Sequence, residues 1–126
     1  MFADRQATAM LPAQDLQRAK SWYADKLGLV PAEENGEMGA VYMLGGGTRV
    51  FLYPTRFAGT APHTLLSFAS PAPVADMQKL RDKGVVFLDY DLPGLKTENG
   101  LASFGDVRNA WCKDSEGNIL GFVEGM

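Results

Sequence analysis

The fold is decided by the segment DLQRAKSWYADKLGLV, residues 15–30, which predicts an amphipathic helix with a signal at each end. Asp15 is a favourable N-cap because its carboxylate can accept a hydrogen bond from a free backbone N–H of the first turn. Gly28 is suited to the left-handed conformation that ends many helices. Between them, apolar residues recur at helical spacing and charged residues occupy the opposite face. The segment DKGVV, residues 82–86, is a similar helix exit and follows a second apolar helix face, formed by Val74, Met77 and Leu80.

Short apolar segments surround the two helices in the same order in each half of the chain, which indicates internal duplication. In the first half, we expect strands at residues 7–11, 29–33, 41–44 and 49–53. In the second half, a long connection precedes the last two strands, and the strands are expected at residues 64–69, 85–88, 107–112 and 119–124. The sequence therefore predicts an α+β fold of two βαβββ modules, about residues 5–55 and 62–125, in a single domain spanning residues 1–126.

The composition of the 126 residues excludes several classes of function. Hydrophobic residues make up 46% and charged residues 21%, as is usual for a globular protein. The net charge of −3 argues against nucleic acid or a membrane surface as the partner, because anionic partners require clustered Lys and Arg. The single cysteine, Cys112, and the single histidine, His63, exclude a disulfide framework, Cys-based zinc sites and paired-His metal motifs.

The sequence also predicts the cellular compartment. Asp4 and Arg5 stand near the start, where a signal peptide would need a basic patch followed by an unbroken apolar run. Apolar runs are far shorter than the roughly 20 residues that span a bilayer. Since a single free thiol suits a reducing environment, we expect a cytoplasmic protein.

A pattern spread over nearly the whole chain is carried by Asp15-Leu16, Trp22-Tyr23, Leu27-Gly28-Leu29, residues 75–84 and the turn 114–118. This pattern resembles the vicinal oxygen chelate superfamily, which includes glyoxalase I, extradiol dioxygenases, and bleomycin and fosfomycin resistance proteins. The resemblance implies that the strands of both modules curl into a half-open barrel around a concave pocket. It also implies a homodimer, in which both subunits can build the pocket. Because one scaffold hosts several chemistries, the resemblance specifies the fold more closely than the activity.

The resemblance further implies a test for a metal site. Enzymes of this superfamily usually hold a divalent metal with side chains from the first and last strands of each module. In this chain, those positions fall at Thr8, Leu52, His63 (or its neighbour Thr64) and Gly121. A catalytic metal normally takes about three protein ligands, and only His63 is a good one. The sequence therefore predicts no metal and no cofactor, although a lyase, isomerase or dioxygenase with an atypical metal site stays open as an alternative.

Strand alternation predicts what lines the concave side. With the four metal-ligand positions as register marks, the side chains assigned to the face packed on the helices are Ala9, Phe51, Tyr53, Leu66, Phe68, Leu120 and Phe122. Those assigned to the concave side are Thr8, Met10, Val50, Leu52, Leu65, Ser67, Gly121 and Val123. Mostly apolar walls with few polar groups are typical of a small-molecule pocket, although a filled barrel or a dimer core would have the same pattern. The predicted ligand-binding residues are Thr8, Met10, Leu52, His63, Leu65, Phe104, Trp111 and Gly121.

Two single residues have alternative interpretations. His63 is either a hydrogen-bonding group or general base at the pocket mouth, or an ordinary half-exposed histidine at the start of a strand. Cys112 is better explained as a small buried hydrophobic residue than as a nucleophile, because no second histidine or helix N-terminus activates it. The sequence thus favours a metal-free protein that binds an unidentified small molecule, with no catalytic residue assigned. A module that binds a protein segment is a further alternative.

Overall fold

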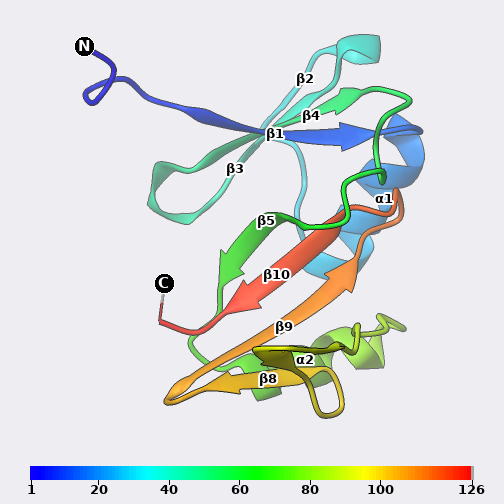
Figure 1. Ribbon diagram of the computed structural model, residues 1–126. Helices are drawn as coiled ribbons and strands as arrows, with labels where there is room; N and C mark the ends of the chain where they lie inside the picture. Colours follow the sequence, from blue (N-terminus) through cyan, green and yellow to red (C-terminus); the bar gives the residue numbers. More distant parts are fainter. Residues whose placement is uncertain (126) are drawn as a thin grey trace.

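The computed structural model describes residues 1–125, which form two four-stranded sheets, each accompanied by one α-helix (Figure 1). The first module contains β1 (Thr8–Ala13), α1 (Leu16–Leu27), β2 (Glu33–Glu34), β3 (Ala40–Met43) and β4 (Arg49–Pro54). The second contains β5 (Thr64–Ala69), α2 (Pro73–Asp82), β8 (Leu101–Phe104), β9 (Val107–Lys113) and β10 (Ile119–Val123). A small hairpin between α2 and β8 consists of β6 (Asp91–Leu92) and β7 (Leu95–Lys96).

Both sheets have the same topology, with the strand orders β1-β4-β3-β2 and β5-β10-β9-β8. In each module the first and last strands pair in parallel, and the other neighbours are antiparallel. The sheets do not close into a barrel, and α1 and α2 lie behind the strands in Figure 1, so the other face is open toward the viewer. The prediction of an α+β fold with two βαβββ modules in a half-open arrangement is confirmed.

Helix α1 has the ends that its sequence predicts. The carboxylate of Asp15 accepts a hydrogen bond of 3.0 Å from the backbone N–H of Arg18. Gly28 adopts φ 66° and its N–H bonds to the carbonyl of Tyr23, which ends the helix in a left-handed cap. On the inner side of the helix, Ala19 and Tyr23 are buried, so the apolar stripe packs on the first sheet.

Two predicted strands are wrong, each for a local reason. Of residues 29–33, only Glu33 begins a strand, because Pro31 has no N–H and Leu29 is still part of the helix cap, bonding to the Tyr23 carbonyl. Residues 85–88 form only an isolated bridge between Phe87 and Cys112. The place beside β9 is taken instead by β8, since a tight turn at residues 105–106 lets β8 and β9 pair as a local hairpin.

The predicted orientation of β4 is also wrong. Strand β4 pairs with β1 in parallel, with Leu52 opposite Leu11 and Arg49 opposite Thr8. Opposed residues share a face, and Leu52 is 0% exposed in the core. Its neighbour on that face, Val50, pairs with Tyr42, whose ring lies 6.3 Å from that of Tyr23 on α1. Val50 and Leu52 therefore face the helix, and the open side of β4 carries Phe51 and Tyr53.

In the second module, the predicted alternation is correct. Ser67 lies opposite Gly121, and Phe68 lies opposite Phe122. The rings of Phe68 and Phe122 are stacked with centroids 5.9 Å apart, and Phe122 also packs edge-on against Phe87 on the α2 side. Ser67 and Gly121 consequently belong to the open face.

The turn between β9 and β10, residues 114–118, joins the two modules. The Tyr23 hydroxyl donates a hydrogen bond of 2.5 Å to the Asp114 carboxylate. The Asn118 side-chain amide donates to the Pro12 carbonyl over 2.8 Å. Glu116 accepts from the backbone N–H groups of Gln14 and Asp15 and forms a bidentate pair with Arg18. These contacts fix the first module to the end of β9 in the second.

Candidate small-molecule site

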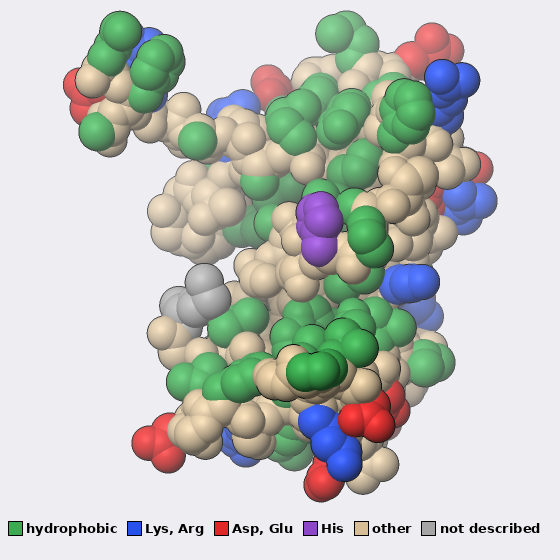
Figure 2. All heavy atoms as spheres, in the orientation of Figure 1, with side chains coloured by type: hydrophobic (Ala, Val, Ile, Leu, Met, Phe, Trp, Pro, Cys, Tyr) green, Lys and Arg blue, Asp and Glu red, His purple; other side chains and the backbone are tan. Residues whose placement is uncertain are grey.

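The open faces of the two sheets form the candidate site. Figure 2 shows hydrophobic side chains gathered on this side of the molecule, with the imidazole of His63 near its centre. Among the large hydrophobic residues of these strands, Met10 is 52% exposed and Phe104 is 45% exposed. Exposed apolar surface of this extent on paired sheets is typical of a binding surface rather than of a solvated exterior.

Most of the predicted site residues lie on this open face. Thr8 and Met10 project from β1, because they alternate with the buried Leu11 and Ala13. On the second sheet, Trp111 lies directly opposite Gly121, and the residues that share their face include Leu65 and Phe104. His63 precedes β5, is exposed, and has its Nδ1 3.1 Å from the Thr64 carbonyl. Leu52 is the exception, since its side chain points into the core.

Three aromatic residues of the open face were not predicted. Phe51 and Tyr53 project from β4, and the parallel pairing of β4 with β1 would have placed them there. The third is Tyr90, whose ring packs edge-on against Trp111 with centroids 5.5 Å apart. Tyr90 comes from the long connection before β8, and no sequence pattern indicates that it folds back onto β9. The site is therefore more aromatic than the sequence suggested.

The residues at the family's metal positions do not fit a divalent metal. Thr8 offers a hydroxyl, and the open side of β4 offers Phe51 and Tyr53 rather than a carboxylate. At Gly121, an added Cβ would lie 2.6 Å from the Ser67 hydroxyl oxygen, so the space of a ligand side chain is already occupied. Throughout residues 1–125, no three His, Cys, Asp or Glu side chains are grouped as a metal site requires.

Nucleophilic chemistry is not supported at Cys112. The thiol is buried, and burial together with the nearby Asp114 carboxylate raises its pKa to about 12. The thiolate that would attack a substrate is therefore scarce at neutral pH. The predicted burial of Cys112 is confirmed.

The buried carboxylates of Asp114 and Glu116 form hydrogen bonds between the two modules. Burial opposes ionisation of Glu116, but hydrogen bonds from Arg18, the Asp15 N–H and Ser115 outweigh it and lower the pKa of this carboxyl to about 2. Burial and the adjacent Asp114 carboxylate raise the pKa of Tyr23, so its hydroxyl remains a donor. Tyr23 is thus bonded to Asp114, and Glu116 to Arg18, at the turn between β9 and β10.

The arrangement defines a class: a paired βαβββ protein with an open, mostly apolar face that, within residues 1–125, carries no grouping of acidic or imidazole ligands. The chain belongs to the Glyoxalase/Bleomycin resistance protein/Dioxygenase superfamily, whose family model matches residues 5–122. No helix in the described part of the chain has the length and apolar character needed to cross a membrane.

Several solved structures share the fold. A lactoylglutathione lyase from Agrobacterium tumefaciens is 14% identical with a TM-score of 0.73, covering 98% of this chain and 96% of its own. A glyoxalase/bleomycin resistance protein from Catenulispora acidiphila is 20% identical with a TM-score of 0.70, covering 96% and 98%. TnmS3, an antibiotic-binding protein from a Streptomyces species, is 22% identical with a TM-score of 0.65, covering 96% and 97%. No curated protein matches the sequence.

Proposed function

We propose that the protein binds a small, partly apolar or aromatic compound on the open face of its sheets, without a metal or other cofactor. The observation that carries this proposal is the composition of that face. Trp111, Phe104 and Met10 supply half-exposed apolar surface, while Thr8 and Ser67 supply a few hydroxyl groups. Apolar walls with a small number of polar groups are what small-molecule sites require.

The charge of the open face narrows the ligand class. Among the described residues, the strands that form it place one carboxylate on the open side, that of Glu33 on the short edge strand β2, and Arg49 lies opposite Thr8 on the same side. These two charges are opposite in sign, so the face offers no net counter-charge to a strongly basic or acidic compound, and a neutral compound is favoured. The likeness to TnmS3, an antibiotic-binding protein, supports small-molecule binding as the kind of function.

We also propose that the site is completed in a homodimer in the cytoplasm. Several large hydrophobic side chains are more exposed than a monomer favours, among them Met10 and Met43 on the open face and Phe57 in the connection to β5. A second copy placed over the half-open sheets would bury this surface and close the site. The free thiol of Cys112 is consistent with a reducing compartment.

A neutral hydrophobic dye tests the proposed face. Nile red is titrated against the wild type, Met10→Asp and Met38→Asp. Met10 lies on the open face, whereas Met38 is 73% exposed on the loop before β3, so it is the matched control. A carboxylate placed in an apolar site opposes binding, and we expect Met10→Asp to bind at least about tenfold more weakly, with Met38→Asp unchanged. Equal dissociation constants for all three proteins would contradict the proposal.

A further inference from the structure

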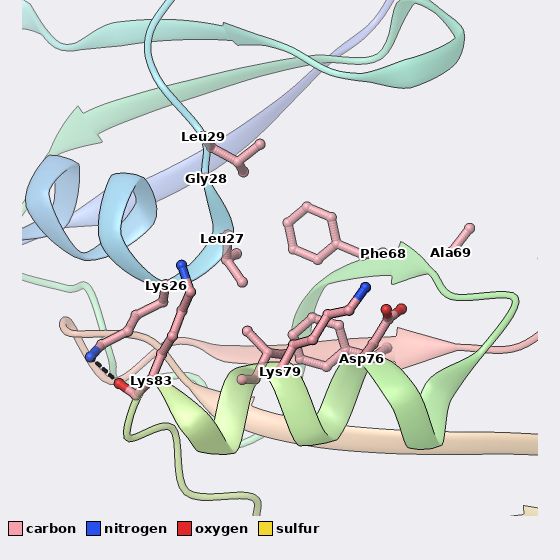
Figure 3. A pocket seen from close by; sticks show the side chains of 11 residues that line it. Lys26, Leu27, Gly28, Leu29, Phe68, Ala69, Asp76, Lys79 and Lys83 are labelled. Atoms are coloured by element: carbon pink, nitrogen blue, oxygen red, sulfur yellow. Dashed lines mark hydrogen bonds between the residues drawn. The ribbon is translucent and has the colours of Figure 1, made fainter.

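A separate cavity of about 370 Å³ lies on the opposite side of the sheets, between the last turn of α1 and one face of α2 (Figure 3). The first module contributes the end of α1 and the segment that follows it, up to Leu29. The second module contributes one face of α2 together with Phe68 and Phe122 from β5 and β10. The cavity thus lies on the boundary between the modules and has no part in the open face.

The floor of this cavity is apolar and partly aromatic. The ring planes of Phe68 and Phe122 are inclined by only 17°, so the aromatic surface they contribute to the floor has nearly one orientation. Leu27 and Leu29 face them from the first module, and Leu29 is held there because Gly28 turns the chain out of the helix. A flat aromatic body fits such a floor better than a branched aliphatic one, since aromatic rings gain from offset stacking and edge contacts.

The rim of the cavity is positively charged. It carries the three lysines Lys26, Lys79 and Lys83 against a single carboxylate, Asp76. Lys26 and Lys83 are already hydrogen-bonded across the module boundary. The Lys26 ammonium donates to the backbone carbonyl of Lys83, and the Lys83 ammonium donates to the backbone carbonyl of Asp25. They close one end of the cavity.

Lys79 differs from the other two lysines. In Figure 3 its ammonium points away from Lys26 and Lys83, toward the end of the cavity that holds Phe68 and Asp76, and among the described residues it takes part in no salt bridge. The nearby Asp76 carboxylate instead accepts a hydrogen bond of 2.6 Å from the Ser70 hydroxyl. An uncommitted cation at the edge of an apolar cavity is a counter-charge for an anionic group whose body lies on the floor.

We propose that this cavity is a second binding site, which takes an aromatic monocarboxylate with its ring on Phe68 and Phe122 and its carboxylate on Lys79. The volume is within the range of small-molecule sites and suits a molecule of one or two rings. The preference for an anionic ligand distinguishes this cavity from the open face, where a neutral ligand is proposed. Because the cavity is built from both modules, a bound ligand would also strengthen their contact.

The test uses 2-naphthoate as the probe and its neutral amide, 2-naphthamide, as the matched ligand. Amide chemical shifts in ¹H–¹⁵N spectra locate binding, and titration gives the dissociation constant. We expect 2-naphthoate to shift the amides of Gly28, Leu29 and Ala69, and to bind at least about fivefold more tightly than 2-naphthamide. Lys79→Glu should weaken 2-naphthoate at least about fivefold, and Lys79→Arg should keep it within about twofold.

Two controls separate this site from the open face. Lys113→Glu reverses an exposed charge at the end of β9, which does not line the cavity, and should leave binding unchanged. Met10→Asp, which tests the open face, should also leave 2-naphthoate binding unchanged. Three results would overturn the proposal: no shift of the cavity amides at millimolar probe, equal affinity of the wild type and Lys79→Glu, or loss of 2-naphthoate binding in Met10→Asp alone.

Discussion

The two modules share a strand order, but the turns that join their last two strands differ in burial and in their contacts with the other module. In the first module, the turn between β3 and β4 consists of Gly45, Gly46 and Gly47 and is exposed. In the second, the turn between β9 and β10 holds the buried Asp114, Glu116 and Asn118, which bind the first module. Duplicated topology therefore does not imply duplicated function: one turn only reverses the chain, while the other determines how the modules sit together.

The largest effect should come from Asp114. Its carboxylate accepts hydrogen bonds from the Tyr23 hydroxyl, two backbone N–H groups and the Asn118 amide. Asp114→Ala leaves these buried donors without an acceptor, so we expect a loss of about 3–5 kcal/mol in the free energy of unfolding. Urea denaturation measures it, with Gly45→Ala in the first-module turn as the control. Gly45 has open space around it. If Gly45→Ala lowered the free energy of unfolding as much as Asp114→Ala, the proposed difference between the two turns would be contradicted.

The orientation of β4 can be tested by two truncations on neighbouring residues. Leu52 is completely buried, so Leu52→Ala should cost about 3 kcal/mol, whereas Phe51→Ala on the open face should cost clearly less. Thermal and urea unfolding of both variants give the difference. If Phe51→Ala were the more damaging change, the register of β4 against β1 would be wrong.

A pair of glycines tests how closely the modules approach. Gly59 has φ +77°, and an added Cβ would lie 2.2 Å from the Glu116 carbonyl oxygen. Gly94 has nearly the same φ, +79°, but nothing within 4 Å. We expect Gly94→Ala to cost about 1 kcal/mol for the backbone conformation alone, and Gly59→Ala to cost about 1–2 kcal/mol more. Equal costs would show that the contact at the turn is not tight.

The pH dependence of stability tests Glu116. Its folded-state pKa of about 2 is below the ordinary value of 4.5, so its ionised form contributes stability that is complete above pH 4.5. That contribution is lost as the pH falls from 4.5 toward 2. Unfolding free energies at a series of pH values should therefore fall less steeply through this window in Glu116→Gln than in the wild type. Parallel curves would mean that Glu116 is not held ionised by Arg18 and the turn.

The sequence predicted what depends on local signals. The ends of α1 follow from Asp15 and Gly28, and the repeated order of elements predicted the two modules. Alternation worked for β5 and β10, because Ser67 and Gly121 were assigned to the correct face. It failed for β4. Leu52 was assigned to the same face as Thr8 only because both fall at the family's metal positions, and the true register of β4 against β1 is a long-range pairing that the sequence does not specify.

Other features had no local signal. Tyr90 reaches Trp111 from a long connection, and Glu116 meets Arg18 across 98 residues of sequence. The cavity between the helices exists only because the two modules pack at a particular angle. Such contacts depend on tertiary packing, which patterns of polarity along one strand or helix do not specify.

Metal-free binding of a small molecule by a dimer can be tested by native mass spectrometry of protein purified without a chelator. We expect a dimer whose mass includes a small organic compound and no metal, and we expect Met10→Asp to carry less of this compound than Met38→Asp. Treatment with EDTA should change neither the mass nor the melting temperature by more than about 1 °C. A stoichiometric divalent metal, lost together with the compound on EDTA treatment, would contradict metal-free binding and support the metal-dependent enzymes of the superfamily.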